Sequence, residues 1–190
     1  MSQSPTPAPL AETPDQEMAA PDMPRIYVAC LASYNNGRLH GAWVDAGQGE
    51  DQIWKGVHEM LVASPDPHAE EWAIHDYDGF DDAYISEYAC LEHVCALAEF
   101  IFEHGTLGAK LYNHFGGDLS QASAAFNDYA GEYTSVAEFA EQLTGDAGPE
   151  VPDSLQYYID WQAMGRDLEL GGDVFTIETR FDQLHVFWSR

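Results

Sequence analysis

The sequence predicts an α+β fold divided into three small domains. Its 190 residues allow one to three such domains. Hydrophobic residues make up 45% of the chain and aromatic residues 13%, so most of it can form a core despite its high charge. The spacing of apolar residues also changes along the chain, from strand-like alternation to helical periodicity and then to a mixture of both.

Residues 1–23 are predicted to form a disordered tail ahead of these domains. Prolines interrupt this segment, and it has neither the basic start nor the apolar core of a secretory signal. Order is expected to begin near Arg25, where the first apolar run starts.

Residues 24–78 are predicted to form a domain of β-sheet plus helix. Asn36-Gly37 separates two apolar runs, and this dipeptide favours a hairpin because both residues tolerate a positive φ. Ile53 and Val57 belong to a run with helical spacing. The expected elements are a strand at 26–33, a strand at 39–44, a helix at 51–62 and a strand at 71–77.

Residues 79–128 are predicted to form a helical domain. An apolar stripe with helical spacing begins at Leu91 and runs to Phe102, and Gly105 is expected to end this helix. Two shorter helices are expected at 107–115 and 118–127, the second with Asp118 as its N-cap.

Residues 129–190 are predicted to combine helices with a small antiparallel sheet. Ser135 and Glu138 have the spacing of a capping box at the start of a helix. Gly171-Gly172 is expected to end the helical part. The expected elements are a helix at 135–143, a loop at 145–152, a helical region at 154–170 and strands at 174–178 and 184–188.

The chain carries 33 Asp and Glu residues against 7 Lys and Arg, a formal net charge of −26. Nucleic acids and anionic lipids bind proteins through Lys and Arg, so a polyanion repels both. No apolar run reaches the 18 residues of a membrane span. We therefore predict a basic protein partner, with neither nucleic acid nor membrane as a partner. A halophilic or merely very soluble protein is the simpler explanation that charge alone leaves open.

Three cysteines, Cys30, Cys90 and Cys95, form an odd and sparse set. They indicate free thiols in a reducing compartment, and we expect a cytoplasmic protein. His93 lies between two of them, but the spacing lacks the paired Cys-x-x-Cys pattern of zinc sites. We therefore expect Cys95 in the core and His93 on the surface.

Catalytic and metal-binding motifs find no support in the sequence. A calcium loop starting at Asp76 fails, because Phe80 occupies a ligand position and the glycine is misplaced. There is no Gly-x-Ser-x-Gly motif, phosphate-binding glycine loop or dinucleotide fingerprint. We predict no catalytic residue, no metal and no cofactor.

The carboxylates instead spread along nearly the whole folded region. Duplex DNA carries one charge per about 1.7 Å of axis, so 26 charges on one face would match about 44 Å, or about 13 base pairs. This pattern indicates a protein that presents carboxylates to a nucleic-acid-binding partner.

Three segments resemble the ArdA antirestriction family. They are PRIYVA with the following YNNG and LHGAW (residues 24–43), EEWAIHDYDGF (70–80) and YIDWQAMGRDL (158–168). The resemblance extends from about Pro24 to the C-terminus and leaves out the proline-rich tail.

The resemblance implies an inhibitor of type I restriction-modification enzymes. Members of this family are carried by mobile genetic elements and mimic bent B-form DNA in the DNA groove of the enzyme, formed by its methyltransferase core and specificity subunit. The family architecture is an elongated, curved chain of small α/β and α-helical domains that forms a homodimer through its C-terminal domain.

Residue roles follow only in part from this resemblance. The family's antirestriction motif falls near 151–165, and the implied dimer-contact residues are Leu155, Tyr158, Ile159, Trp161 and Met164. The phosphate-mimicking carboxylates are chosen for their expected exposure: Asp76, Asp78, Asp81, Asp82, Glu87, Glu92, Glu99, Glu103, Asp118, Asp128, Glu132, Glu138 and Glu141.

Two other functions are retained as alternatives. An acidic interaction module could sequester another basic DNA-binding protein. A small acidic enzyme would instead have a deep pocket lined by a few carboxylates and a histidine such as His75.

Overall fold

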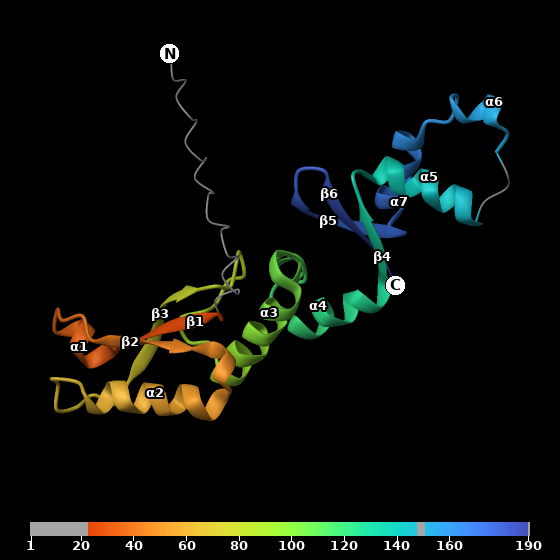
Figure 1. Ribbon diagram of the computed structural model, residues 1–190. Helices are drawn as coiled ribbons and strands as arrows, with labels where there is room; N and C mark the ends of the chain where they lie inside the picture. Colours follow the sequence, from red (N-terminus) through yellow and green to blue (C-terminus); the bar gives the residue numbers. More distant parts are fainter. Residues whose placement is uncertain (1–22, 148–150, 190) are drawn as a thin grey trace, which may run out of the picture.

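The first part of the chain forms a three-stranded antiparallel sheet. The computed structural model describes residues 23–147 and 151–189, so the predicted tail lies almost wholly outside the described residues. The strands are β1 (Arg25–Cys30), β2 (Gly41–Asp45) and β3 (Trp72–Asp78), in the order β2-β1-β3. Mixed helices and strands confirm the predicted α+β class (Figure 1).

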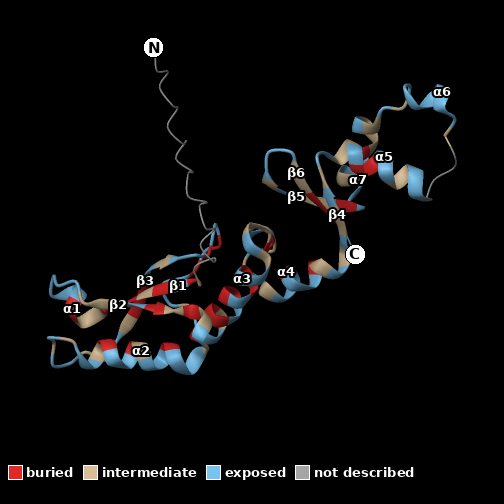
Figure 2. Ribbon diagram, viewed as in Figure 1, coloured by how far each residue is buried: buried red, intermediate tan, exposed pale blue. Residues whose placement is uncertain are grey.

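Helix α2 (Glu50–Val62) covers this sheet with one apolar face, as its helical spacing predicts. Ile53, Val57 and Met60 are buried and belong to the same core cluster as Ile26 and Val28 of β1. The opposite face of the helix is exposed (Figure 2). The short 3₁₀ helix η1 (Ala46–Gln48) connects β2 to this helix.

The antiparallel pairing of β1 with β2 confirms the predicted hairpin, but its strands are shorter and its connection is longer than predicted. Strand β1 ends at Cys30, and Leu31–Asn35 forms a short helix, α1, before β2 begins at Gly41. Gly37 does take a positive φ, of 72°, but within this longer connection. Buried Ser33 explains the difference, because its hydroxyl donates to a carboxylate outside the sheet and turns the chain away from the extended path.

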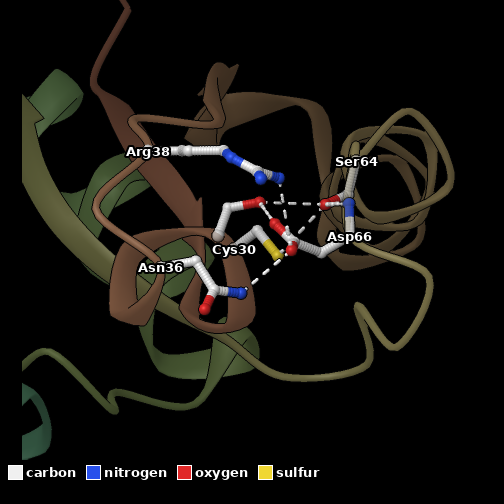
Figure 3. A network of polar contacts seen from close by, with 6 residues as sticks. Cys30, Asn36, Arg38, Ser64 and Asp66 are labelled. Carbon is white, nitrogen blue, oxygen red and sulfur yellow. Dashed lines mark hydrogen bonds and ion pairs between the residues drawn. The ribbon is translucent and has the colours of Figure 1, made fainter.

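That carboxylate is Asp66, in the loop after α2, and it holds the connection in place (Figure 3). Asn36 Nδ2 donates to its Oδ1 at 2.9 Å, and Arg38 Nη1 lies 3.4 Å from the same oxygen. The hydrogen bond from Ser33 is the main cause that lowers the pKa of Asp66 below its ordinary value, and the contacts with Asn36 and Arg38 lower it further. Ser64 Oγ completes the network, 3.5 Å from Cys30 Sγ.

The middle of the chain is helical, as predicted. Helix α3 (Leu91–His114) is interrupted at Gly105, whose φ of 54° and ψ of −142° confirm the expected break. Helix α4 (Leu119–Ala125) begins after Asp118, which caps it by accepting from Gln121 N. Phe102 is half exposed, a departure from the predicted stripe; Phe100 is buried in its place.

A second antiparallel sheet occupies the last part of the chain, with strand order β4-β6-β5. Strand β4 (Tyr129–Tyr133) was not predicted, whereas the hairpin of β5 (Val174–Arg180) and β6 (Gln183–Trp188) confirms the two expected strands. The short 3₁₀ helix η2 (Phe126–Asp128) leads into β4.

Three helices accompany this sheet. Helix α5 (Val136–Ala147) starts at the predicted capping residues, with Ser135 Oγ accepting from Glu138 N. The predicted single helical region at 154–170 is wrong: it divides into α6 (Asp153–Gln156) and α7 (Trp161–Gly171). Asp160 causes the division, because its carboxylate accepts from Ala163 N and starts a new helix.

Five aromatic rings join the helical middle to the second sheet, and we call them the aromatic ladder. His104 of α3 stacks on Phe126 at 4.0 Å between ring centroids, and Phe126 meets the edge of Phe187 in β6 at 6.2 Å. Phe187 stacks on Phe175 of β5 at 5.0 Å, and Phe175 stacks on His114 of α3 at 4.7 Å. The ladder therefore fixes the second sheet to both halves of α3. The division into three domains stays a prediction.

Loss of Phe187 should destabilise the protein strongly. Its ring is fully buried within the ladder, so Phe187→Ala should lower the free energy of unfolding by about 3–5 kcal/mol. Phe181, 88% exposed at the β5–β6 turn, is the matched control, and Phe181→Ala should change it by no more than about 0.5 kcal/mol. Chemical denaturation of both variants measures the difference; equal effects would contradict the ladder's role.

Acid should remove the stabilising effect of Asp66. Its pKa is lowered in the folded state, so its contribution is present above the ordinary pKa of about 3.9 and is lost as the pH falls below it. Wild-type protein should therefore melt at a higher temperature than Asp66→Asn at neutral pH, and the gap should close towards a pH of about 2. A gap independent of pH would show that the charge of Asp66 does not stabilise the connection.

Candidate partner-binding surface

Positive charge is almost absent from a long central part of the chain. Between Lys55 and Arg166, the sequence has one Lys or Arg residue, Lys110. The predicted phosphate-mimicking carboxylates lie in this part, and all of them are exposed except Asp128, which is half-buried. The described surface from β3 to α5 therefore presents carboxylates with few neighbouring cations.

Helix α3 presents one set of these carboxylates in a regular array. Glu92, Glu99 and Glu103 are exposed, whereas Val94 and Leu97 on the other side are buried in the core. At about 1.5 Å of rise per residue, the three carboxylates follow one another at steps of about 10 Å and about 6 Å along the helix. A buried face thus holds a row of negative charges at fixed separations.

The loop between β3 and α3, residues 79–90, presents a second set. Asp81, Asp82 and Glu87 are exposed, and Asp81 has a positive φ of 50°. Buried Phe80 and Ile85 anchor the loop to the core. The backbone of Glu87 accepts from Ile74 N at 2.9 Å, and that of Asp82 accepts from Asn113 Nδ2 at 2.7 Å. These bonds tie the carboxylate-bearing loop to β3 and α3.

Several of the predicted carboxylates have partners within the protein. Asp78 forms an ion pair with Arg25, whose guanidinium approaches to 2.8 Å and also lies over the ring of Trp43. Asp118 accepts from the side chain and backbone of Gln121, and both bonds lower its pKa. Asp78 is thus the weakest of the predicted phosphate mimics, since a cation already balances its charge.

Glu138 also has a partner, and its bond differs by one residue from the predicted capping box. Its carboxylate accepts from the hydroxyl and backbone N–H of Thr134, and these two bonds lower its pKa. Two further exposed carboxylates, Glu132 on β4 and Glu141 on α5, extend the acidic surface towards the second sheet. Asp76 lies on edge strand β3, with its carboxylate bonded to Tyr77 N.

The predicted dimer-contact residues fall into two groups. Leu155 and Tyr158 are exposed, the tyrosine at 85%, and Tyr157 beside them is exposed as well. Ile159, Trp161 and Met164 are half-buried, and the sulfur of Met164 lies 3.6 Å from Thr144 Oγ1 of α5. The apolar stretch around α6 is therefore open to solvent in the single chain. Tyr157 was not among the dimer-contact residues predicted from the sequence. The signal that could have indicated it is its position directly before the predicted contact residue Tyr158, in a segment without helical periodicity.

The two histidines and the cysteine that were considered as catalytic or metal-binding groups make structural contacts within the fold. His75 is half-buried, with its ring edge-on to Tyr34 and its Nε2 3.8 Å from Glu87. His93 is half-buried and bonded to Tyr112, which corrects its predicted surface position, while Cys95 is buried as predicted.

Two negative findings apply to the described residues. Within residues 23–147 and 151–189, no three His, Cys, Asp or Glu side chains are arranged to hold a metal ion. Over the same part of the chain, no helix combines the length and apolar character needed to cross a membrane.

A family model described as "Antirestriction protein (ArdA)" matches residues 26–183, a range that runs from β1 through β5. No curated protein matches the chain.

Proposed function

The chain belongs to the ArdA family of antirestriction proteins, and from this premise we propose that it inhibits type I restriction-modification enzymes by occupying their DNA-binding groove. ArdA is a family of inhibitor proteins and not of enzymes, which favours this function over a small acidic enzyme. The target within the enzyme is proposed to be the methyltransferase core with its specificity subunit, and the proposed location is the cytoplasm.

The exposed carboxylates of α3 and of the 79–90 loop carry the proposal. Each takes the place of a DNA phosphate, and the buried core beneath holds it at a fixed position. Anions that surround the basic groove of the enzyme would be released when the carboxylates bind, just as counterions are released when a protein binds DNA phosphates. The same charges would speed the encounter between the two proteins.

A second copy of the chain would extend the acidic surface. We propose that the exposed apolar stretch at Leu155, Tyr157 and Tyr158 forms the contact between two copies, with Ile159, Trp161 and Met164 supporting it. An isologous dimer of this kind presents the same patch from both copies and doubles the length of the carboxylate array.

Neutralising the α3 carboxylates together should weaken inhibition, although single changes should have small effects. Each exposed charge contributes on the order of 1 kcal/mol or less, so Glu99→Gln alone should change the dissociation constant by a few-fold at most. The triple variant Glu92→Gln, Glu99→Gln, Glu103→Gln should weaken binding further and flatten its dependence on salt. Titration with purified enzyme at several salt concentrations measures both.

A second triple variant with the same net charge serves as the control. It separates the effect of where the carboxylates lie from the effect of total charge. Asp167→Asn, Glu178→Gln and Asp182→Asn together also remove three exposed carboxylates, but outside the proposed mimic set. This variant should bind nearly as the wild-type protein does. Equal losses in the two triple variants would contradict a located phosphate-mimicking surface and favour a general effect of charge.

Charge placed in the apolar stretch should separate the proposed dimer. Tyr158 is exposed in the single chain, so Tyr158→Asp should leave the monomer folded while adding repulsion and an unpaired charge at the contact. Sedimentation velocity should show a dimer for the wild-type protein and a monomer for the variant. The matched control is Phe181→Asp, at an equally exposed aromatic position on the β5–β6 turn; a monomeric wild-type protein would refute the proposed contact.

A further inference from the structure

A cavity opens within the acidic surface, where the 79–90 loop meets helix α3. Its volume is about 490 Å³, within the range of sites that accept a sizeable ligand group. The wall combines the loop, both ends of α3 and the turn that follows α3, through Tyr84, Ile85, Cys90, His93, Tyr112 and Gly117. The cavity therefore lies beside the carboxylate-bearing loop and the first turn of α3, which carries Glu92.

The wall of this cavity favours an apolar occupant. Among the described residues that line it, none is Lys, Arg, Asp or Glu. Its polar groups are largely engaged with the protein: His93 Nε2 and Tyr112 Oη are bonded to each other at 2.9 Å, and Asn113 Nδ2 donates to the backbone of Asp82. An apolar group could enter without leaving these atoms unpaired, whereas a charged group would lose its water without gaining a counterion.

The rim of the cavity has the opposite character. Tyr84 and Tyr88 are 68% and 71% exposed, which is unusual for large rings on a loop anchored to the core. Tyrosine is enriched at the centres of protein interfaces because it combines apolar area with a hydroxyl. Glu87 and Glu92, both exposed, directly adjoin the lining residues Ser86 and His93 in sequence, and the backbone of exposed Asp82 accepts a hydrogen bond from the lining residue Asn113. The residues that border the cavity therefore include exposed carboxylates.

We propose that this cavity receives one bulky apolar side chain of the restriction enzyme, flanked on the enzyme by Lys or Arg. The inference rests on the proposed function and adds a contact that phosphate mimicry does not supply, because the apolar side chain enters a cavity lined by neutral groups. Charge complementarity fixes the partner: the apolar wall selects the side chain, and the carboxylates at the rim select its basic neighbours. Such an anchor would contribute affinity that salt does not screen.

Cys90 allows the cavity to be filled in the intact protein. It is the exposed one of the three free cysteines, and its side chain makes no capping bond to α3. A benzyl methanethiosulfonate reagent should attach a benzyl group there through a disulfide and occupy the cavity, and a reducing agent should remove it. Cys90→Ser treated with the same reagent is the matched control.

The proposal predicts a specific change in binding to the purified type I enzyme. The benzyl adduct should raise the dissociation constant at least about tenfold, as expected for loss of an anchor side chain. The slope of its logarithm against the logarithm of salt concentration should stay unchanged, because no charge is altered. Reduction should restore wild-type binding, and the treated Cys90→Ser control should bind as untreated protein does.

A second variant tests the cavity without an adduct that could distort the loop. Tyr84→Ala removes an exposed wall of the cavity and should leave the melting temperature nearly unchanged, yet weaken binding with the same unaltered salt slope. Wild-type affinity of both the adduct and Tyr84→Ala would overturn the anchor, and so would a loss accompanied by a changed slope. Failure of the unmodified protein to bind the enzyme would instead refute the proposed function, and with it this inference.

Discussion

The aromatic ladder is the contact on which the arrangement of the whole molecule depends. The first sheet and the second sheet share no strand, and the chain between them consists of helices with a break at Gly105. His104 precedes this break and His114 follows it, and each of them stacks on a ring from the C-terminal half of the chain. Because stacked rings are confined to a narrow range of geometries, the two sheets are held at one relative orientation. The proposed fit into a groove of fixed shape requires such rigidity.

The charge of the protein makes this rigidity costly, since the carboxylates repel one another and favour expansion. Burial offsets the repulsion. One cluster of buried apolar residues runs from Ile26 in the first sheet through α3 to Phe187 in the second, so much of the chain shares a continuous core. A smaller cluster around Phe139 and Val186 supports α5 against β6. The repulsion is therefore spread over an extended scaffold, and an elongated shape keeps like charges farther apart than a sphere would (Figure 1).

The sequence predicted most helices and strands, because periodicity and capping residues are local signals. Gly105 and Asp118 marked a helix end and a helix start that the structure confirms. The failures came where a distant partner decides the local structure. Ser33 turns the chain into α1 only because Asp66, thirty-three residues later, accepts its hydrogen bond. Strand β4 has a glycine at its centre and little alternation of apolar and polar residues, and it is a strand because β6 pairs with it. The exposed carboxylates were predictable as a class, but their neighbours, such as Arg25 beside Asp78, depend on the folded chain.

Electrostatics alone would make such a protein an indiscriminate ligand for basic surfaces. Long-range attraction raises the rate of encounter with any cationic groove, and exposed ion pairs contribute little to discrimination between them. Selection of one partner requires contacts that a wrong partner cannot make, such as a fixed spacing of charges or a filled apolar cavity. The ladder supplies the first by holding the carboxylates of α3 and the second sheet in register. The cavity beside Tyr84 would supply the second, next to the carboxylate-bearing 79–90 loop. Under the proposed mimicry of DNA, specificity would thus come from the features in which the protein differs from DNA.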